Sequence, residues 1–488
     1  MNKDRKPGRP QRPTRSASGS ARRSAASARQ AGPGAGDAPI AEGLAADLLN
    51  AAVAATAALL TFIQPADAAL SAFFRARKSG ARDRAFIAET VYAVLRRKRL
   101  LERLAACGPN LEAAFLAPGA TPKRGPGDGT RQAGVRRVSP RELVLLSLSR
   151  VRGMSQRQLG GALLPGEAEW LADIRRQPEP ELTLAEQLDF PDWLAERLAP
   201  RMTPDELLAL ARALNTPAPL DLRVNTLKAE RDAVTTRLAA DGIVAVPCPY
   251  SPLGLRLKTK PYLQKHPAFL DGSIEVQDEG SQLLGFLLAP KRSEMVVDFC
   301  AGAGGKTLIL GAMMRSTGRL YAFDVSDKRL AKLKPRAARA GLSNVHPACL
   351  SGENDTRVKR LQGKADRVLV DAPCSGLGTL RRNPDLKWRQ SPQSVAELTV
   401  KQAAILAAAA KLLRPGGRLV YATCSILAEE NEDIVNAFLA THDGFHRLPA
   451  QEVLAAQGIA IDCGEDMRLS PQKHGTDAFY AAVLERAK

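Results

Sequence analysis

The sequence predicts a doubly wound α/β domain in its C-terminal part, preceded by an all-α region and a small α+β module. From Ser293 onward, short runs rich in Val, Leu and Ile alternate with helical patterns that begin at Lys306, Asp327 and about Ser394. Continuous apolar runs are typical of parallel strands buried on both faces, and their alternation with helices indicates a doubly wound sheet. The expected strands are MVVDFC, RLYAFDV, NVHPACL, RVLVDAP and RLVYATCS.

Two further units are expected before the α/β domain. Between about Ala41 and Leu171, apolar residues recur at three- and four-residue spacing, which predicts amphipathic helices. After the helical pattern TPDELLALARALN, the chain reads strand, helix, strand, strand, an order that suggests a small α+β module. The predicted domains are a disordered basic tail (1–38), a helical domain (39–175), an α+β module with linker helices (186–285) and the α/β domain (286–488).

The charge balance favours a polyanionic partner. Lys and Arg number 70 against 51 Asp and Glu, which gives a formal net charge of +19. Nucleic acids bind such surfaces because each neutralised phosphate releases condensed counterions. On charge alone, a merely basic enzyme is an equally good interpretation.

The cysteine spacing and the lengths of the apolar segments argue against a disulfide-rich, metal-binding or membrane protein. The seven Cys are scattered, with no CxxC pair and no zinc spacing, so we expect neither a disulfide framework nor a metal site. A reducing compartment, the cytoplasm, fits this usage. No apolar core of signal-peptide type and no run of about 18 apolar residues occurs, so no membrane association is expected. The oligomeric state stays open, with a monomer favoured.

A Gly-rich turn follows the first strand of the α/β domain. It comprises Cys300, Ala301, Gly302, Ala303, Gly304, Gly305 and Lys306. Small residues let a turn approach a ligand closely, and the N-terminus of the next helix offers free N–H donors. The turn lacks the spacing of a phosphate-binding P-loop, and the next strand ends in Asp324, which can accept hydrogen bonds from a ribose. The pair favours an adenosine-containing cofactor, either a dinucleotide or S-adenosylmethionine, while the alternative role for Asp324 is a helix N-cap.

Two cysteines follow the ends of two other strands. Cys374 comes shortly after Asp371, and Cys424 directly follows Thr423. In an open parallel sheet, ligands bind beyond the carboxyl ends of the strands, so both thiols should face the cofactor. A single free Cys is more often a small buried apolar side chain. Two at matching strand ends favour a catalytic pair.

Carbon methylation of a pyrimidine needs such a pair. C5 of cytosine is a weak nucleophile until a thiolate adds to C6, after which C5 can attack the sulfonium methyl group of S-adenosylmethionine. A carboxyl group such as Asp371 can assist by protonating N3. The target base must lie outside a helix, in a single-stranded loop or flipped out.

These residues resemble the RsmB/Sun family of RNA 5-methylcytosine methyltransferases. The resemblance covers most of the chain and rests on the Gly-Gly-Lys-Thr turn, Asp324, and the two cysteine motifs Asp371-Ala-Pro-Cys-Ser and Thr-Cys424-Ser. It also includes the segments Val276–Gln282, Arg382–Trp388 and His474–Phe479. The family implies a Rossmann-like class I methyltransferase domain, a NusB-like RNA-binding domain in the helical region and an RRM-like module between them.

The resemblance also implies roles for individual residues. Cys424 matches the covalent nucleophile, and Cys374 matches the cysteine that helps release the methylated RNA. Asp371 and Lys306 match residues around the target base and the methyl donor. The turn from Cys300 to Lys306, together with Asp324 and Asp371, matches the contacts of S-adenosylmethionine. Because DNA methyltransferases use the Pro-Cys cysteine instead, the Thr-Cys-Ser motif favours RNA, with rRNA preferred over tRNA because of the NusB-like region.

Two departures from the family pattern, and two other classes of function, stay open. Ala303 replaces the usual Pro of the turn, and the acid expected near the adenine can be Glu353, Asp355 or the region of Ser351. A non-catalytic RNA-binding ribosome-assembly factor would also suit the basic tail and the helical domain. An NAD-dependent dehydrogenase would explain the Gly-rich turn but not the paired cysteines.

Overall fold

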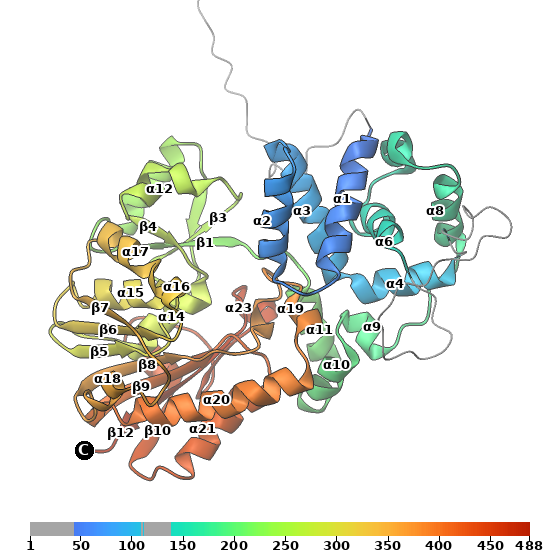
Figure 1. The fold of residues 1–488 in the computed structure, drawn as a ribbon. Coiled ribbons are helices and arrows are strands. Elements are labelled where there is room, and N and C mark those ends of the chain that lie inside the picture. Colours follow the sequence, from blue (N-terminus) through green and yellow to red (C-terminus); the bar gives the residue numbers. More distant parts are fainter. Residues whose placement is uncertain (1–42, 109–110, 112–137) are drawn as a thin grey trace, which may run out of the picture.

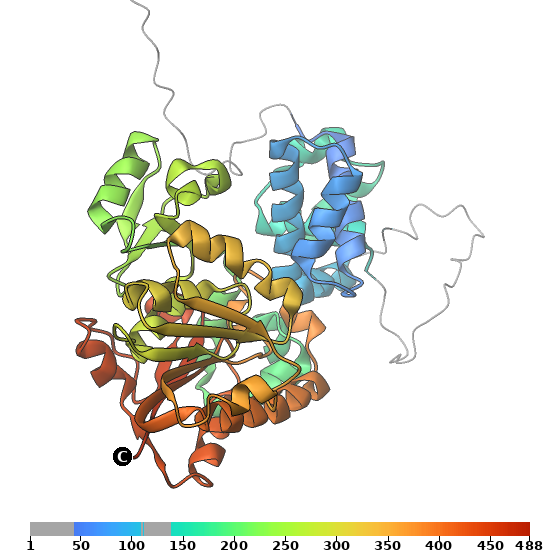
Figure 2. The same ribbon diagram turned by 60° about the vertical axis from the view of Figure 1, so that its left-hand side comes forward.

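The computed structural model describes residues 43–108, 111 and 138–488, and Figures 1 and 2 show their arrangement. The predicted basic tail (1–38) and the breaker-rich segment at 125–129 lie outside the described residues. In the part of the chain that is described, every helix is too short or too polar to cross a lipid bilayer.

The N-terminal unit is helical, as expected. Its helices are α1 (Ala46–Leu59), α2 (Ala66–Ala76), α3 (Ala81–Arg96), α4 (Lys98–Cys107), α6 (Pro140–Leu146), α7 (Gln156–Leu159) and α8 (Glu167–Arg176). They enclose one apolar core that contains the fully buried Leu49, Ile87 and Leu101. The helical pattern predicted over residues 83–106 forms two helices, α3 and α4, because Arg97 leaves the helical region with φ −113° and ψ 23°. The likeness to NusB is compatible with this unit and stays a prediction.

Three short helices connect this unit to the rest of the chain: α9 (Leu184–Leu188), α10 (Asp192–Leu198) and α11 (Pro204–Leu214). Their apolar faces form a core cluster with residues of the α/β domain, including Leu377 and Leu427. These two leucines lie just beyond Cys374 and Cys424 in the chain. The linker helices therefore pack against the loops that carry the two cysteines.

The small α+β module has one strand more than expected. It consists of β1 (Leu220–Val224), α12 (Arg231–Ala240), β2 (Ala245–Pro247), β3 (Gly254–Leu257), α13 (Pro267–Leu270) and β4 (Ile274–Val276). The sheet is antiparallel, with the order β2-β3-β1-β4. Three-residue β4 was not expected, because so short a strand shows no alternation and owes its conformation to pairing with β1. Figure 1 shows this module and the helical unit above the same side of the α/β domain.

The α/β domain has the predicted parallel sheet. Its strands are β5 (Met295–Asp298), β6 (Arg319–Asp324), β7 (Val345–Cys349), β8 (Ala365–Asp371) and β9 (Leu413–Thr423). The parallel order is β9-β8-β5-β6-β7. After β5 the chain adds β6 and β7 on one side of it and then returns to add β8 and β9 on the other side. The topological switch point therefore lies between β5 and β8. The helices of this domain are α14 (Glu279–Leu288), α15 (Gly305–Met313), α16 (Asp327–Leu330), α17 (Leu333–Ala340), α18 (Thr356–Lys359), α19 (Leu386–Arg389), α20 (Pro392–Ala410), α21 (Glu432–Leu439), α22 (Ala450–Ala455) and α23 (Pro471–His474).

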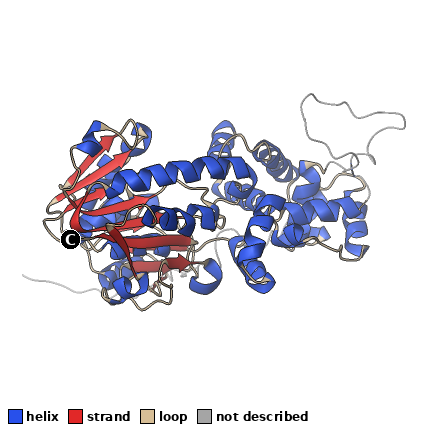
Figure 3. Cartoon of the chain, turned by 90° about the horizontal axis from the view of Figure 1, so that it is seen from below, coloured by secondary structure: helices blue, strands red, loops and turns tan. Residues whose placement is uncertain are grey.

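The far edge of this sheet is antiparallel and was not expected. It consists of β10 (Phe445–Leu448), β11 (Met467–Leu469) and β12 (Phe479–Arg486). β12 pairs antiparallel with β9, and β10 and β11 both pair with β12. Figure 3 shows the strands as one twisted layer with helices on both sides. Such an added edge strand shields β9 on the side away from β8.

Two apolar layers hold the helices on the sheet. Val296 packs in the layer with α14, α15 and α22, whereas Val297 packs in the layer with α20 and α21. Leu369 packs in the first of these layers and Val370 in the second. Successive strand residues point to opposite faces, so these uninterrupted apolar runs bury both faces at once. Each buried Val or Leu contributes about 1.5–3 kcal/mol relative to full exposure.

The segment Arg382–Trp388 joins the helical unit to the α/β domain. Asp385 accepts a hydrogen bond from the first backbone N–H of α2 (3.1 Å). The Lys387 ammonium donates to the carbonyl of Arg96 (2.9 Å), and the Trp388 indole donates to the carbonyl of Leu95 (2.8 Å). Lys387 is fully buried, and burial lowers its pKa to about 7. A family motif next to the Cys374 loop thus anchors the helical unit.

Candidate active site

The Gly-rich turn runs from the end of β5 to the start of α15. Gly304 has φ +90°, and a Cβ at this position would lie 2.2 Å from the Leu333 side chain. Only glycine therefore fits there. Gly302 has φ +57°, and a Cβ on it would meet no atom within 4 Å, so open space lies beside the turn. The expected cradle for a ligand is present.

Neighbouring groups fix the rest of the turn. The backbone N–H of Ala301 donates to the carbonyl of Phe323 on β6 (2.7 Å). The carbonyl of Ala303, which stands where the family has Pro, accepts from the Arg336 guanidinium (2.6 Å). Cys300 is half-buried, and burial raises the pKa of its thiol well above the ordinary range. It is thus a neutral group at the start of the turn.

Asp324 lies at the carboxyl end of β6, beside the turn. Its Oδ2 accepts from the backbone N–H of Gly302 (2.9 Å), and its Oδ1 accepts from the N–H of Ser326 (2.7 Å). The N-cap of α16 is Ser326, whose hydroxyl accepts from the N–H of Arg329. The alternative interpretation of Asp324 as a helix N-cap is therefore wrong. Ribose binding by this carboxylate stays a proposal.

The structure adds one acid, Asp298, to the site residues that were predicted from the sequence. Asp298 ends β5, is fully buried, and accepts through Oδ2 from the Thr307 hydroxyl (2.7 Å). Its Oδ1 has no hydrogen-bond partner among the residues that the structure describes. Burial, together with the negative charges of Asp371 and Asp324, raises the pKa of Asp298 to about 7. An acid at the end of the first strand, just before a Gly-rich turn, was the available signal.

These carboxylates discriminate between the two cofactors considered. Asp298, Asp324 and Asp371 are close enough for their charges to interact. They would repel the diphosphate of a dinucleotide, whereas S-adenosylmethionine carries a cationic sulfonium and an ammonium. The unpaired carboxylate oxygen and the open side of Gly302 fit the cationic cofactor.

The Asp298→Asn variant should gain stability over wild type as the pH rises. In wild type the folded-state pKa of about 7 exceeds the unfolded value of 3.8, so the stability contributed by this carboxyl is lost between those pH values. Asn keeps the shape and does not ionise, so the difference in free energy of unfolding should grow by roughly 4 kcal/mol at most. Chemical denaturation of both cofactor-free proteins at pH 4.5 and about pH 7.5 measures this difference. A difference independent of pH would contradict the proposed environment.

The adenine-side residue stays open among the three candidates. Asp355 caps α18, and its Oδ2 accepts from the backbone N–H of Ser351 (3.0 Å). The Arg357 guanidinium also pairs with this carboxylate (2.8 Å). Glu353 accepts only from the neighbouring Asn354 amide among the hydrogen bonds found in the described residues. Asp355 and Ser351 are thus bonded to each other within this loop, and all three residues stay candidates.

Cys374 and Cys424 come together as predicted. β8 and β9 are adjacent and parallel, so the loops after them leave the same edge of the sheet. The two Sγ atoms lie 3.4 Å apart. The hydrogen bond with Cys424, followed by burial, raises the pKa of Cys374 well above its ordinary range. Cys374 is therefore the protonated member of the pair when Cys424 is a thiolate.

Lys306 and Asp371 form an ion pair beside these thiols. The distance from Lys306 Nζ to Asp371 Oδ2 is 2.6 Å, and both side chains are about one-fifth exposed (19% and 22%). Burial alone would lower the pKa of Lys306, but the charge and the hydrogen bond of Asp371 raise it, and Cys424 adds to this effect. Lys306 thus stays cationic within reach of the Cys424 sulfur. All four predicted catalytic residues meet at one edge of the sheet.

Arg382 joins three separate sequence motifs behind the site. Its guanidinium pairs with Asp278 (2.9 Å) and with Asp477, and donates to the carbonyl of Pro219 (3.2 Å). Burial and the neighbouring Asp278 raise the pKa of Asp477 to about 6. The segments Val276–Gln282 and His474–Phe479 are therefore joined through Arg382, and the second also borders the site, because the centre of the Phe479 ring lies 5.7 Å from Lys306 Nζ.

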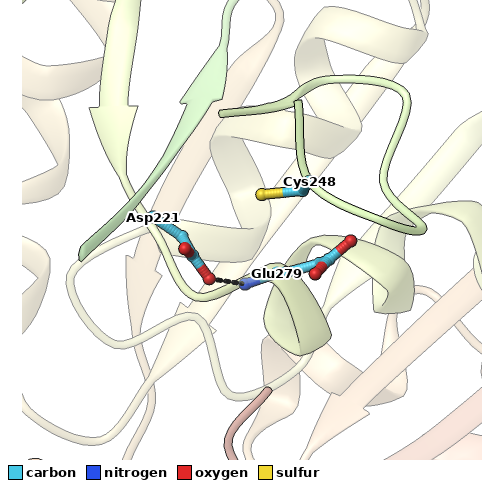
Figure 4. Close-up of side chains that lie close together, drawn as sticks. All are labelled: Asp221, Cys248 and Glu279. Carbon is cyan, nitrogen blue, oxygen red and sulfur yellow. Dashed lines mark hydrogen bonds between the residues drawn. The ribbon is translucent and has the colours of Figure 1, made fainter. Parts of the chain in front are cut away.

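Within the described residues, a group of possible metal ligands lies between the small module and α14. Asp221, Cys248 and Glu279 have ligand atoms within 4.8 Å of one another (Figure 4). The Arg256 guanidinium donates to both Asp221 oxygens (2.7 and 2.9 Å) and pairs with Glu279 (3.4 Å). Burial and the nearby carboxylates raise the pKa of Cys248, which keeps the thiol protonated. A guanidinium thus already supplies the positive charge, and the group links β1 to α14.

Comparisons with known proteins identify the family. The family model described as 16S rRNA methyltransferase RsmB/F matches residues 285–485, and that of the RsmF/B-like ferredoxin-like domain matches residues 190–263. The probable ribosomal RNA small subunit methyltransferase B of Synechocystis is 33% identical over 431 residues, which cover 83% of this chain and 92% of the relative. Ribosomal RNA small subunit methyltransferase B of Sodalis glossinidius is 35% identical over 323 residues, or 65% of this chain and 72% of the relative.

Solved structures share the architecture. The crystal structure of PH0851 superposes with a TM-score of 0.71 at 27% identity and covers 91% of this chain and 99% of that chain. A methyltransferase homolog from Pyrococcus horikoshii gives a TM-score of 0.54 at 28% identity and covers 62% of this chain and 97% of that chain. The Rossmann-like methyltransferase fold is confirmed, and the small module is of the ferredoxin-like type, which is compatible with the RRM-like expectation.

The family predicted from the motifs is thus confirmed by relatives that align over most of the chain. The protein is a methyltransferase that uses S-adenosylmethionine and acts on RNA. The chain belongs to the RsmB/F family of 16S rRNA methyltransferases.

Proposed function

We propose that this protein methylates C5 of a cytosine in rRNA through a covalent bond between Cys424 and C6 of the base. The pair of thiols 3.4 Å apart, beside the Lys306–Asp371 ion pair, carries this proposal. The curated relatives are named ribosomal RNA small subunit methyltransferase B, which supports rRNA as the substrate. The net charge of +19 suits such a polyanion.

Cys424 attacks first. Its thiolate, stabilised by the Lys306 cation, forms a bond to C6 while the C5–C6 π electrons move into the ring and N3 takes a proton. In this proposal the Asp371 carboxyl, which holds Lys306 at 2.6 Å, supplies that proton and takes it back at the end of the cycle. Bound S-adenosylmethionine supplies an electrophilic methyl group at the Gly-rich turn. C5 would accept this methyl group as the bond from the methyl carbon to the sulfonium sulfur breaks, which leaves S-adenosylhomocysteine and a tetrahedral C5.

Cys374 serves the second half of the reaction. The C5 proton must pass to water and N3 must give back its proton, while the S–C6 bond breaks, the C5–C6 double bond re-forms and Cys424 leaves as a thiolate. Cys374 is the nearest thiol to the Cys424 sulfur and is held protonated beside it. We propose that this thiol promotes release of the methylated RNA.

The Cys374→Ala variant should therefore accumulate a covalent protein–RNA complex. It keeps the attacking Cys424 and the Lys306–Asp371 pair, so the S–C6 bond forms, but its breakdown is slowed by roughly 100-fold or more. Denaturing gel electrophoresis of the variant with rRNA and S-adenosylmethionine measures the complex. Addition of the Cys424→Ala change should abolish it, and a complex that survives this second change would contradict the assignment.

Release of tritium from RNA labelled at C5 of cytosine tests the proposed function. Replacement of the C5 proton by a methyl group must release one tritium for each methyl group that enters. We expect equal release and incorporation with small-subunit rRNA, and neither without S-adenosylmethionine. Methyl incorporation without tritium release would place the methyl group on another atom. RNA binding without any transfer, or transfer to tRNA alone, would also contradict the proposal.

A further inference from the structure

A buried carboxylate lies behind the two cysteine loops and belongs to neither. Glu430 ends a short 3-10 turn after β9 and is fully buried. Its Oε1 accepts from the backbone N–H of Ser375 (2.8 Å) and from the Gln402 amide (3.0 Å). Its Oε2 accepts from the hydroxyls of Ser375 and Ser425. One side chain therefore receives hydrogen bonds from both loops.

The two serines transmit this anchoring to the sulfur atoms. Ser375 directly follows Cys374, and Ser425 directly follows Cys424. The serine hydroxyl oxygens lie 3.2 Å apart, and the neighbouring sulfur atoms lie 3.4 Å apart. Because each cysteine shares a peptide bond with its serine, a shift of either serine moves the adjoining sulfur.

The backbone that carries Glu430 is itself fixed to β9. The Tyr421 hydroxyl donates to the carbonyl of Glu430 (2.7 Å). The Asn431 amide donates to the carbonyl of Ser425 (3.1 Å), and its oxygen accepts from the Thr423 hydroxyl. Glu430 thus reaches the serines from a rigid position.

The hydrogen bonds of this residue argue for a role beyond packing. No ion pair of Glu430 occurs within the described residues, so four hydrogen-bond donors alone offset its burial. Burying a carboxylate without a cation is costly unless its oxygens are fully hydrogen-bonded. An apolar residue could fill the space, but it could not hold both loops.

We propose that Glu430 is a positioning residue that holds Cys374 and Cys424 at their working separation through Ser375 and Ser425. This inference rests on the proposed function, because it supposes that one sulfur attacks the base and the other assists release. Misplacement of a reacting group by about 1 Å can cost roughly 100-fold in rate. Both Glu430 oxygens are occupied by Ser375, Ser425 and Gln402, so in this proposal Glu430 acts only through the loops.

The Glu430→Ala variant should lower kcat for methyl transfer by roughly 100-fold and leave KM for RNA and S-adenosylmethionine within about twofold. The fraction of protein trapped as covalent RNA complex should rise, because release needs Cys374 close to Cys424. The conservative Glu430→Gln variant, whose amide can bond the same serines, should recover most of kcat. Glu429→Ala is the matched control, because Glu429 is a half-buried neighbour that pairs with Arg197.

A double-mutant cycle tests the route through the serines. The Ser375→Ala/Ser425→Ala protein should show the same loss of kcat, and adding Glu430→Ala to it should cause little further loss. If Glu430→Ala alone folds poorly, the loss of kcat in the Ser375→Ala/Ser425→Ala protein still tests the inference. That protein keeps the buried carboxylate, bonded to Gln402.

Three results would overturn the inference while wild-type protein methylates RNA. They are an unchanged kcat in the Glu430→Ala protein, equal losses in the Glu429→Ala control, and full additivity with the serine changes. Wild-type protein that transfers no methyl group to RNA would instead refute the proposed function itself.

Discussion

The Cys424→Ala variant is expected to lose methyl transfer to RNA by at least about 10⁴-fold. C5 of cytosine does not attack a methyl donor until a sulfur adds to C6, and Cys374 is held protonated, so it cannot substitute efficiently. Binding of S-adenosylmethionine should change little, because the turn and Asp324 are held by contacts that do not involve Cys424. Transfer of labelled methyl groups and calorimetric titration of the cofactor measure the two effects.

The Cys107→Ala variant is a matched control for the loss of one thiol. Cys107 is an exposed residue at the end of α4 in the helical unit. This change should leave both methyl transfer and cofactor binding at the wild-type level. A Cys424→Ala protein that keeps substantial methyl transfer activity would exclude Cys424 as the essential nucleophile.

The Lys306→Met variant is expected to lower kcat by roughly 10²- to 10⁴-fold. The change removes the cation that faces the Cys424 thiolate and leaves the Asp371 carboxylate without its 2.6 Å partner. Met has a similar length and fills the space, so the turn should keep its shape. Single-turnover methyl transfer and the yield of covalent RNA complex should fall together, because formation of the S–C6 bond becomes slower.

Two observations separate this effect from general damage. Lys401→Met, on the exposed side of α20, removes the same charge away from the site and should leave kcat unchanged. The yield of covalent RNA complex should fall in Lys306→Met and stay at the wild-type level in Lys401→Met. A Lys306→Met variant with normal kcat and a normal yield of this complex would remove Lys306 from the chemistry.

The meeting of the two cysteines could be predicted because it depends on topology. Cys374 and Cys424 are 50 residues apart, but each follows a strand with the apolar run of a parallel sheet. The carboxyl ends of such strands share one edge, so the pattern alone placed both thiols beside the turn. The same reasoning placed Asp371, Lys306 and Asp324.

The groups that support the site could not be predicted, because tertiary contacts define them. Glu430 lies in the run AEENED, which reads as a solvated acidic segment, yet it is fully buried under the serines. Lys387 reads as a surface lysine, but the helical unit covers it completely. β4 and β11 are three residues long, and β10 four, so their patterns are too short to distinguish from loops.

Trapping of wild-type protein with rRNA that contains 5-azacytosine tests the central claim most directly. The nitrogen at position 5 carries no proton to remove after methyl transfer, so the bond between the attacking sulfur and C6 cannot break. Mass spectrometry of the digested complex then identifies the cysteine that carries the base. We predict modification of the peptide that contains Cys424, dependent on intact Lys306. Modification of the Cys374 peptide, or no covalent complex at all, would contradict this account.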